Sequence, residues 1–190
     1  MLISTYFRPE QLVFADESHF NRHTLRRPYA WSLCGERAYR SEFSYCGIKY
    51  SILPALSIDG ILHLEVVKNA ITGDDFRRFV QGLLLCMNKW PLPYSVLVVD
   101  NTSIHKVKGI RKMVEEHGTQ LLYLPAYSLD LNPIELAISN IKAWLCAHRD
   151  HINIELDLDD GNIYDVFWAA VYSVMGGQAR GWYKHSGYVV

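Results

Sequence analysis

Residues 95–100 read SVLVVD, an apolar run that ends in the carboxylate of Asp100. A continuous run of branched aliphatic residues is typical of a buried strand, covered on both faces. A carboxylate at the end of such a strand needs a hydrogen-bond partner or a ligand, because burying a lone charge is costly. Sites in α/β sheets form outside the carboxyl ends of the parallel strands, which is where Asp100 is expected to lie.

The neighbouring segments place this strand in a mixed sheet. Two β-rich runs flank Asp59-Gly60, a strong hairpin signal, and Pro54 predicts a bulge or break in the first arm. Thr72 and Asp75 form a capping-box pattern that begins a helix. The expected order is strand, hairpin, helix, strand, helix, strand and helix, over residues 12–18, 46–67, 72–90, 95–100, 107–118, 119–127 and 132–149. This order predicts an α/β fold with a mixed five-stranded sheet and helices on both faces.

Residues 151–190 differ in character from the rest of the chain. They hold five acids against two basic residues, Arg180 and Lys184, and they end in the glycine-rich stretch MGGQARGWYKHSGYVV. A last helix is expected at about residues 162–175, followed by a tail. We therefore expect one domain over residues 1–150, with an acidic helical appendage and tail over residues 151–190.

Bulk composition indicates an ordinary globular protein. The chain has 190 residues, 49% of them hydrophobic, and a formal net charge of −1, which leaves room only for a local basic patch. We expect no membrane partner, because no apolar run approaches the roughly 20 residues of a membrane span. The four cysteines form no C-x-x-C pair, so we expect reduced thiols in an intracellular protein. Neither G-x-G-x-x-G nor a P-loop occurs, so no small-molecule cofactor is expected.

Three acids stand where strand ends and a helix start could bring them together. Asp16 lies late in the first strand, Asp100 ends the fourth, and Glu135 falls in the first turn of the last of these helices, 35 positions beyond Asp100. They meet only if the first and fourth strands are neighbours, which a right-handed crossover permits but does not require. Three converging carboxylates stay ionised if cations neutralise them, and their hard oxygens suit Mg²⁺ or Mn²⁺. Two such ions can stabilise the attacking and leaving oxygens in phosphoryl transfer.

Each acid also has a plainer interpretation. Asp16 and Asp100 could be turn residues at strand ends, which is the commoner fate of such Asp residues. Glu135 stands three residues after Asn132 and could be a helix-capping carboxylate beside an Asn N-cap, a role compatible with ligand binding. Two further acids compete for the same positions, Glu17 and Asp130.

Three blocks of sequence together resemble the catalytic domain of the DDE superfamily endonucleases, and more narrowly that of mariner-type transposases and their bacterial insertion-sequence relatives. The blocks are FADES (14–18), VVDNTSIH (98–105) and LPAYSLDLNPIE (124–135), and the resemblance covers about residues 12–149. It implies an RNase H-like fold and a two-metal active site. In that site Asp16, Asp100 and Glu135 are the catalytic residues and the ligands of Mg²⁺ or Mn²⁺. It also places Asn101 and His105 beside the site, as residues that contact DNA.

Double-stranded DNA is the partner that the resemblance implies. Arg22, Arg26 and Arg27 follow directly on the first acid and are interleaved with aromatic residues, which suits binding to a nucleic-acid backbone. Lys142 stands seven positions after Glu135, on the same helix face, near enough to hold a phosphate. The plainer interpretation of the arginine segment is a solvated hairpin surface. Transposases of this type generally act as dimers, so a homodimer is expected by resemblance.

The chain departs from the family pattern in two places. Leu129 stands where the family usually has Pro, which should change the rigidity of the loop more than its chemistry. Only 15 residues precede Asp16, too few for the helix-turn-helix modules that recognise element ends. We therefore expect a catalytic domain without its DNA-recognition modules.

The expected function is metal-dependent DNA cleavage and strand transfer, as in transposition and DNA integration. Its expected location is the nucleus of a eukaryote, or the cytoplasm otherwise. Two alternatives remain open at this point. One is a plain RNase H-type nuclease or resolvase that cuts DNA without joining it. The other is a catalytically silent, domesticated domain that binds DNA or protein partners.

Overall fold

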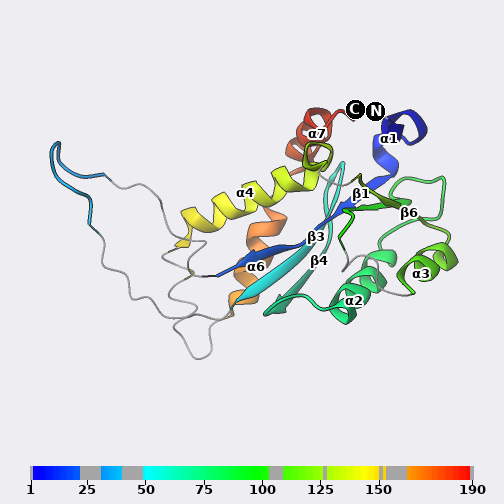
Figure 1. Cartoon of the computed structure of the whole chain (residues 1–190), viewed down its shortest axis with the longest axis horizontal. Helices are drawn as coiled ribbons and strands as arrows, with labels where there is room; N and C mark the ends of the chain where they lie inside the picture. Colours follow the sequence, from blue (N-terminus) through cyan, green and yellow to red (C-terminus); the bar gives the residue numbers. More distant parts are fainter. Residues whose placement is uncertain are drawn as a thin grey trace.

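The computed structural model describes residues 2–21, 31–39, 49–102, 109–125, 128–149, 152 and 162–188 (Figure 1). A central sheet separates two layers of helices. One layer holds α4 (Pro133–Ala147), α6 (Ile163–Tyr172) and α7 (Gly176–His185), and the other holds α2 (Gly73–Leu84) and α3 (Ile110–His117). The predicted α/β class, with helices on both faces of the sheet, is confirmed.

The sheet is mixed, as predicted. Its strands are β1 (Leu12–Ala15), β2 (Ser18–Phe20), β3 (Tyr50–Ser57), β4 (Gly60–Lys68), β5 (Val96–Val99) and β6 (Gln120–Tyr123). β3 pairs antiparallel with β1, β2 and β4, whereas β5 lies between β1 and β6 and runs parallel to both. The carboxyl ends of the parallel strands β1, β5 and β6 therefore lie at the same end of the sheet, where sites form in folds of this kind.

β1 and β2 together occupy one position in the sheet. Ala15 lies opposite Ala55 and Ser18 lies opposite Ile52, so both segments follow β3 in a single register. Only residues 16–17 interrupt the strand. The six assigned strands thus fill five positions, in the order β4, β3, β1 with β2, β5 and β6, which agrees with the predicted five-stranded sheet.

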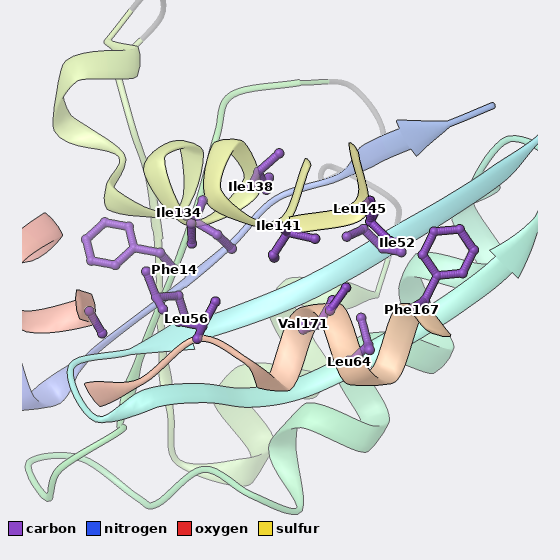
Figure 2. Close-up of a cluster of buried hydrophobic side chains, with 14 of the residues drawn as sticks. Phe14, Ile52, Leu56, Leu64, Ile134, Ile138, Ile141, Leu145, Phe167 and Val171 are labelled. Atoms are coloured by element: carbon purple, nitrogen blue, oxygen red, sulfur yellow. The ribbon is translucent and has the colours of Figure 1, made fainter. Parts of the chain in front are cut away.

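Successive side chains along the central strands point to opposite faces of the sheet, and this divides the core into two clusters. Phe14 on β1 joins the cluster under α4, α6 and α7, whereas Val13 and Ala15 join the cluster under α2 and α3. Figure 2 shows the first cluster, to which α4 contributes Ile134, Ile138, Ile141 and Leu145. The helical spacing of these four residues confirms the predicted core face of α4.

Local signals in the sequence form as predicted. β3 and β4 make a hairpin, and Gly60 at its turn has a φ of +121°, which glycine adopts without strain. The register of the hairpin shifts just after Pro54, where a bulge was expected. Thr72 and Asp75 form the reciprocal capping box of α2: each side chain accepts the backbone N–H of the other residue.

The glycine-rich segment after residue 175 forms the helix α7, so the predicted tail is wrong. Tyr183 in α7 is fully buried, and its hydroxyl donates to the carbonyl oxygens of Leu12 (2.9 Å) and Leu56 (3.1 Å). Gly176 allows the close approach of this helix to the hairpin, because a Cβ there would lie 3.0 Å from the carbonyl oxygen of Asp59. Packing of this kind stabilises helices whose local propensity is poor, and composition does not reveal it.

α6 and α7 complete the hydrophobic cluster that the sheet and α4 begin. α6 begins and ends within the range predicted for the last helix. The division of the chain at residue 150 stays a prediction. Two short elements precede β1, α1 (Leu2–Tyr6) and η1 (Pro9–Gln11), and the sequence pattern did not indicate either. Among the described residues, no helix has both the length and the apolar character needed to cross a bilayer.

His63 on β4 packs beneath α2. Its ring lies 5.5 Å from the ring of Phe79, and its buried Nε2 makes no hydrogen bond within the described part of the chain. Burial lowers the pKa of His63, and the nearby carboxylate of Glu65 opposes this shift. A Cβ on Gly82 of α2 would lie 2.7 Å from the His63 Nε2, so glycine permits this contact.

A pair of glycine substitutions should change stability in opposite directions. Gly82→Ala should destabilise the fold by about 1–2 kcal/mol, because overpacking at the His63 ring costs more than the helix propensity gained. Gly181→Ala, in the exposed face of α7 with nothing within 4 Å of its Cβ, should stabilise by up to about 1 kcal/mol. Urea unfolding measures both changes. Equal stabilisation by the two substitutions would contradict the packing of His63 under Gly82.

The lowered pKa of His63 also predicts a pH dependence of stability. Below the ordinary His pKa of 6.5, the unfolded chain takes up a proton at residue 63 that the folded chain resists, so stability falls as pH falls. The loss is complete once the pH passes below the lowered pKa of the folded state. Urea unfolding at about pH 7.5 and about pH 5.5 should show a larger loss for the wild type than for His63→Gln. An equal loss in both proteins would assign the effect to other groups.

Candidate active site

Parallel pairing of β1 with β5 brings two of the predicted acids to the same level of the sheet. Ala15 is in register with Val99, and each is followed by an acid, Asp16 after β1 and Asp100 after β5. Neighbouring strands lie about 4.8 Å apart, so the two acids leave the sheet side by side at its carboxyl edge. The sequence allowed this neighbourhood without requiring it, and the structure provides it.

Asp16 is buried, with 7% of its surface exposed, and both carboxylate oxygens are hydrogen-bonded. Oδ1 accepts the backbone N–H of Glu17 at 2.8 Å, and Oδ2 accepts the side-chain N–H of Asn132 at 3.0 Å. These two bonds hold the carboxylate from opposite sides, one from the adjacent backbone and one from a distant helix. The second bond joins β1 to the N-terminus of α4, across 116 positions of sequence.

Glu135 lies half-buried in the first turn of α4. Its backbone N–H donates to the carbonyl oxygen of Asn132 at 3.2 Å. The side chain of Asn132 does not cap the helix, because it bonds to Asp16 instead. The N-cap position predicted for Asn132 is therefore correct, but its side chain has a partner that the local pattern did not indicate.

Asp100 is half-buried and bonds within its own turn. Its Oδ1 accepts from the backbone N–H of Thr102 at 3.2 Å and from the Thr102 hydroxyl at 2.9 Å. This is the turn-residue role that was the plainer interpretation of Asp100, and it holds the carboxylate at the strand end. Of the competing acids, Asp130 is exposed in η3 (Leu129–Leu131), and Glu17 lies in the break between β1 and β2.

The donor set fits a hard divalent cation by its chemistry, because the candidate ligands are all carboxylates. Their spacing does not yet make a metal centre. Within the ranges that the structure describes, no three His, Cys, Asp or Glu side chains are grouped closely enough to hold a metal ion. The structure thus places Asp16 and Asp100 at the ends of neighbouring strands. It also holds the start of α4, which carries Glu135, against Asp16, but the three acids do not form one cluster.

The predicted DNA-contacting residues are only partly visible. Asn101 is exposed directly beside Asp100. Lys142 lies two helical turns beyond Glu135, and its Nζ stands 5.9 Å from the ring centroid of Phe20, a cation–π contact with β2. The other four predicted residues, Arg22, Arg26, Arg27 and His105, lie outside the described residues.

The C-terminal residues support the turn that precedes Asn132. Tyr188 is buried, its hydroxyl donates to the carbonyl oxygen of Leu131 at 2.9 Å, and burial raises the pKa of Tyr188 well above its ordinary value. The ring of Tyr188 also lies 5.2 Å from that of Phe14, two residues before Asp16 on β1. One side chain therefore contacts both the strand of Asp16 and the turn that leads to Glu135.

Sheet order and strand directions are those of an RNase H-like fold. The chain belongs to the DDE superfamily endonucleases, because the model of that family matches residues 11–156, a range that includes Asp16, Asp100 and Glu135. The family predicted from the three sequence blocks is confirmed. A comparison with curated protein sequences finds no match.

Solved structures of Mos1 transposase have the same fold. A pre-cleavage Mos1 transpososome matches with a TM-score of 0.59 at 14% identity, over 96% of this chain and 57% of the Mos1 chain. The Mos1 mariner paired-end complex with Mn matches with a TM-score of 0.59 at 15% identity, over 94% of this chain and 56% of that chain. The catalytic domain of Mos1 mariner transposase matches with a TM-score of 0.52 at 14% identity, over 96% and 85% of the two chains.

These structural matches establish a shared fold, and the predicted RNase H-like fold is confirmed. The chain spans little more than half the length of the Mos1 chains in the two complexes.

Removing the Tyr188 hydroxyl should weaken the support of the candidate site. Tyr188→Phe should lower the free energy of unfolding by about 1 kcal/mol, because the partly buried carbonyl of Leu131 loses this donor. Tyr164→Phe, at an aromatic residue that is 41% exposed, is the matched control and should change stability by less than about 0.5 kcal/mol. Equilibrium unfolding in urea distinguishes the two variants, and equal effects would contradict a stabilising bond from Tyr188 to Leu131.

Proposed function

We propose that this chain is the metal-dependent, DNA-cleaving and strand-transferring domain of a transposase, acting in DNA transposition and integration. The observation that carries the proposal is the exit of Asp16 and Asp100 from neighbouring parallel strands, with the helix of Glu135 joined to Asp16 through Asn132. Membership of the DDE superfamily endonucleases supports cleavage of nucleic acid. Solved Mos1 paired-end complexes with Mn and with Mg support a divalent cation.

The three acids have defined roles in this proposal. Asp16, Asp100 and Glu135 would hold Mg²⁺ or Mn²⁺ through their carboxylate oxygens. When bound, such an ion neutralises charge on the scissile phosphate and lowers the pKa of an attacking water.

Cleavage and joining are two displacements at phosphorus. In the first, a water oxygen bonds to the phosphorus at the end of the element while the bond from phosphorus to the 3′-oxygen breaks, which frees a 3′-hydroxyl. In the second, that hydroxyl attacks a phosphodiester of the target DNA, displaces another 3′-oxygen and joins the strands. A nuclease or resolvase would carry out only the first displacement.

Double-stranded DNA is the proposed partner, and a homodimer is the proposed assembly. Two of the proposed DNA contacts are Asn101, exposed directly after Asp100, and Lys142, two helical turns beyond Glu135 in α4. The remaining proposed DNA contacts are Arg22, Arg26, Arg27 and His105. We propose location in the nucleus of a eukaryote, or in the cytoplasm otherwise, because the proposed substrate is found there.

A catalytically silent, domesticated domain that binds DNA or protein is the second candidate. The observation that favours it is the spacing of the acids, since the described residues hold no ready cluster of three metal-ligating side chains. The bonds from Thr102 to Asp100 also fit a purely structural turn.

Metal-dependent cleavage of a labelled DNA duplex tests the proposed enzyme. The wild type should nick the duplex with Mn²⁺ or Mg²⁺, and Asp100→Asn should reduce the rate by about a hundredfold or more, because it removes a ligand rather than an outer partner. Joined products on the same gel indicate strand transfer, whereas nicks alone indicate a plain nuclease.

Glu116→Gln is the matched control for that experiment. Glu116 is an exposed carboxylate near the end of α3, which leads into the start of β6 at the opposite edge of the sheet from Asp100. Its removal should leave cleavage unchanged. A folded wild type that binds no Mn²⁺ by calorimetry, with or without DNA, would reject the enzyme in favour of the silent domain.

A further inference from the structure

The side chain of Asn132 is used in an unusual way for its position. An Asn at a helix N-cap normally accepts a hydrogen bond from a backbone N–H in the first turn. Here that bond is missing, and the side-chain amide donates to Asp16 Oδ2 at 3.0 Å. Asn132 is 2% exposed and Asp16 is 7% exposed, so water does not compete for the contact. The bond to Asp16 thus replaces the usual stabilisation of the helix end.

We propose that Asn132 is a positioning residue that orients the carboxylate of Asp16 for a divalent cation. The proposal rests on the proposed metal site. An ionised carboxylate only accepts hydrogen bonds, so the group of Asn132 that faces it is the NH₂. With Oδ1 held by the backbone of Glu17 and Oδ2 held by Asn132, the plane of the carboxylate is fixed from two sides.

The backbone of Asn132 connects the same residue to Glu135. Its N–H donates to the carbonyl oxygen of Leu129 at 3.0 Å, and its carbonyl oxygen accepts from the N–H of Glu135 at 3.2 Å. The hydroxyl of Tyr188 holds the neighbouring Leu131 at 2.9 Å. The backbone of Asn132 is therefore held on both sides. Its side-chain amide consequently meets Asp16 at a fixed position. Two ligands from distant parts of the chain are oriented through one residue.

A purely structural cross-link between β1 and α4 is the competing explanation. It predicts that loss of the amide weakens the fold and leaves metal affinity unchanged. A positioning role predicts instead that metal affinity falls much more than stability does. Replacing a partner that orients a metal ligand typically changes metal affinity by 10–100-fold. The two explanations are separated by measuring Mn²⁺ affinity and thermal unfolding on the same variants.

Asn132→Ser is the variant that separates them. Serine is a favoured N-cap residue, so the helix start is retained, but its side chain is too short to reach Asp16. Calorimetric titration with Mn²⁺ should show affinity about 10–100-fold weaker than that of the wild type, while the unfolding temperature stays within about 2–4 °C. Where cleavage is measured, raising the Mn²⁺ concentration should restore much of the rate. If the serine variant does not fold, Asn132→Gly, also accepted at N-caps, takes its place.

Two further proteins make the outcome unambiguous. Asn140→Ser makes the same chemical change within α4 at a half-buried position, and should bind Mn²⁺ as the wild type does. Asp16→Asn should abolish binding. Wild-type affinity in Asn132→Ser, with binding lost in Asp16→Asn, overturns the positioning role alone. Absence of Mn²⁺ binding by the wild type overturns the proposed metal site and the positioning role with it.

Discussion

Parallel pairing of β1 with β5 is the contact on which the arrangement of the acids depends. Parallel neighbours cannot be joined by a tight turn, so the chain between them must cross over, and here it builds the β3–β4 hairpin and α2 on the way. The register of Ala15 with Val99 then sets the levels of Asp16 and Asp100. A shift of β5 by one residue would turn Val98 and its neighbours to the opposite face and move Asp100 out of line with Asp16.

Much of the fold was predictable because its signals are local. The apolar run before Asp100, the hairpin at Asp59-Gly60 and the capping box of Thr72 and Asp75 depend on residues only a few positions apart. Strand neighbourhood is a different kind of information. Asp16 and Asp100 are 84 positions apart, and no local pattern records that their strands pair. The sequence could therefore show that the two acids meet only if their strands are neighbours, but it could not show that the strands are neighbours.

The failures of sequence reasoning share a physical cause. Asn132 carries the local pattern of a helix cap, yet its side chain bonds to a residue 116 positions away. Three glycines made the segment of α7 read as a tail, yet Tyr183 within it is fully buried against β1 and β3. In both places a buried hydrogen bond between distant segments outweighs local preference. The three sequence blocks identified the family, although they did not indicate which side chains orient the acids.

The interruption of one strand by residues 16–17 has a consequence for how this region can change in evolution. β1 and β2 follow β3 in a single register on either side of the break, so Phe20 and Phe14 both belong to the cluster under α4. Exchanging Asp16 within the break affects one buried carboxylate and its bond to Asn132. An insertion or deletion of one residue would instead reverse the face of every side chain in β2. We therefore regard the spacing between Phe14 and Phe20 as constrained in length, in addition to the requirement for Asp16 within it.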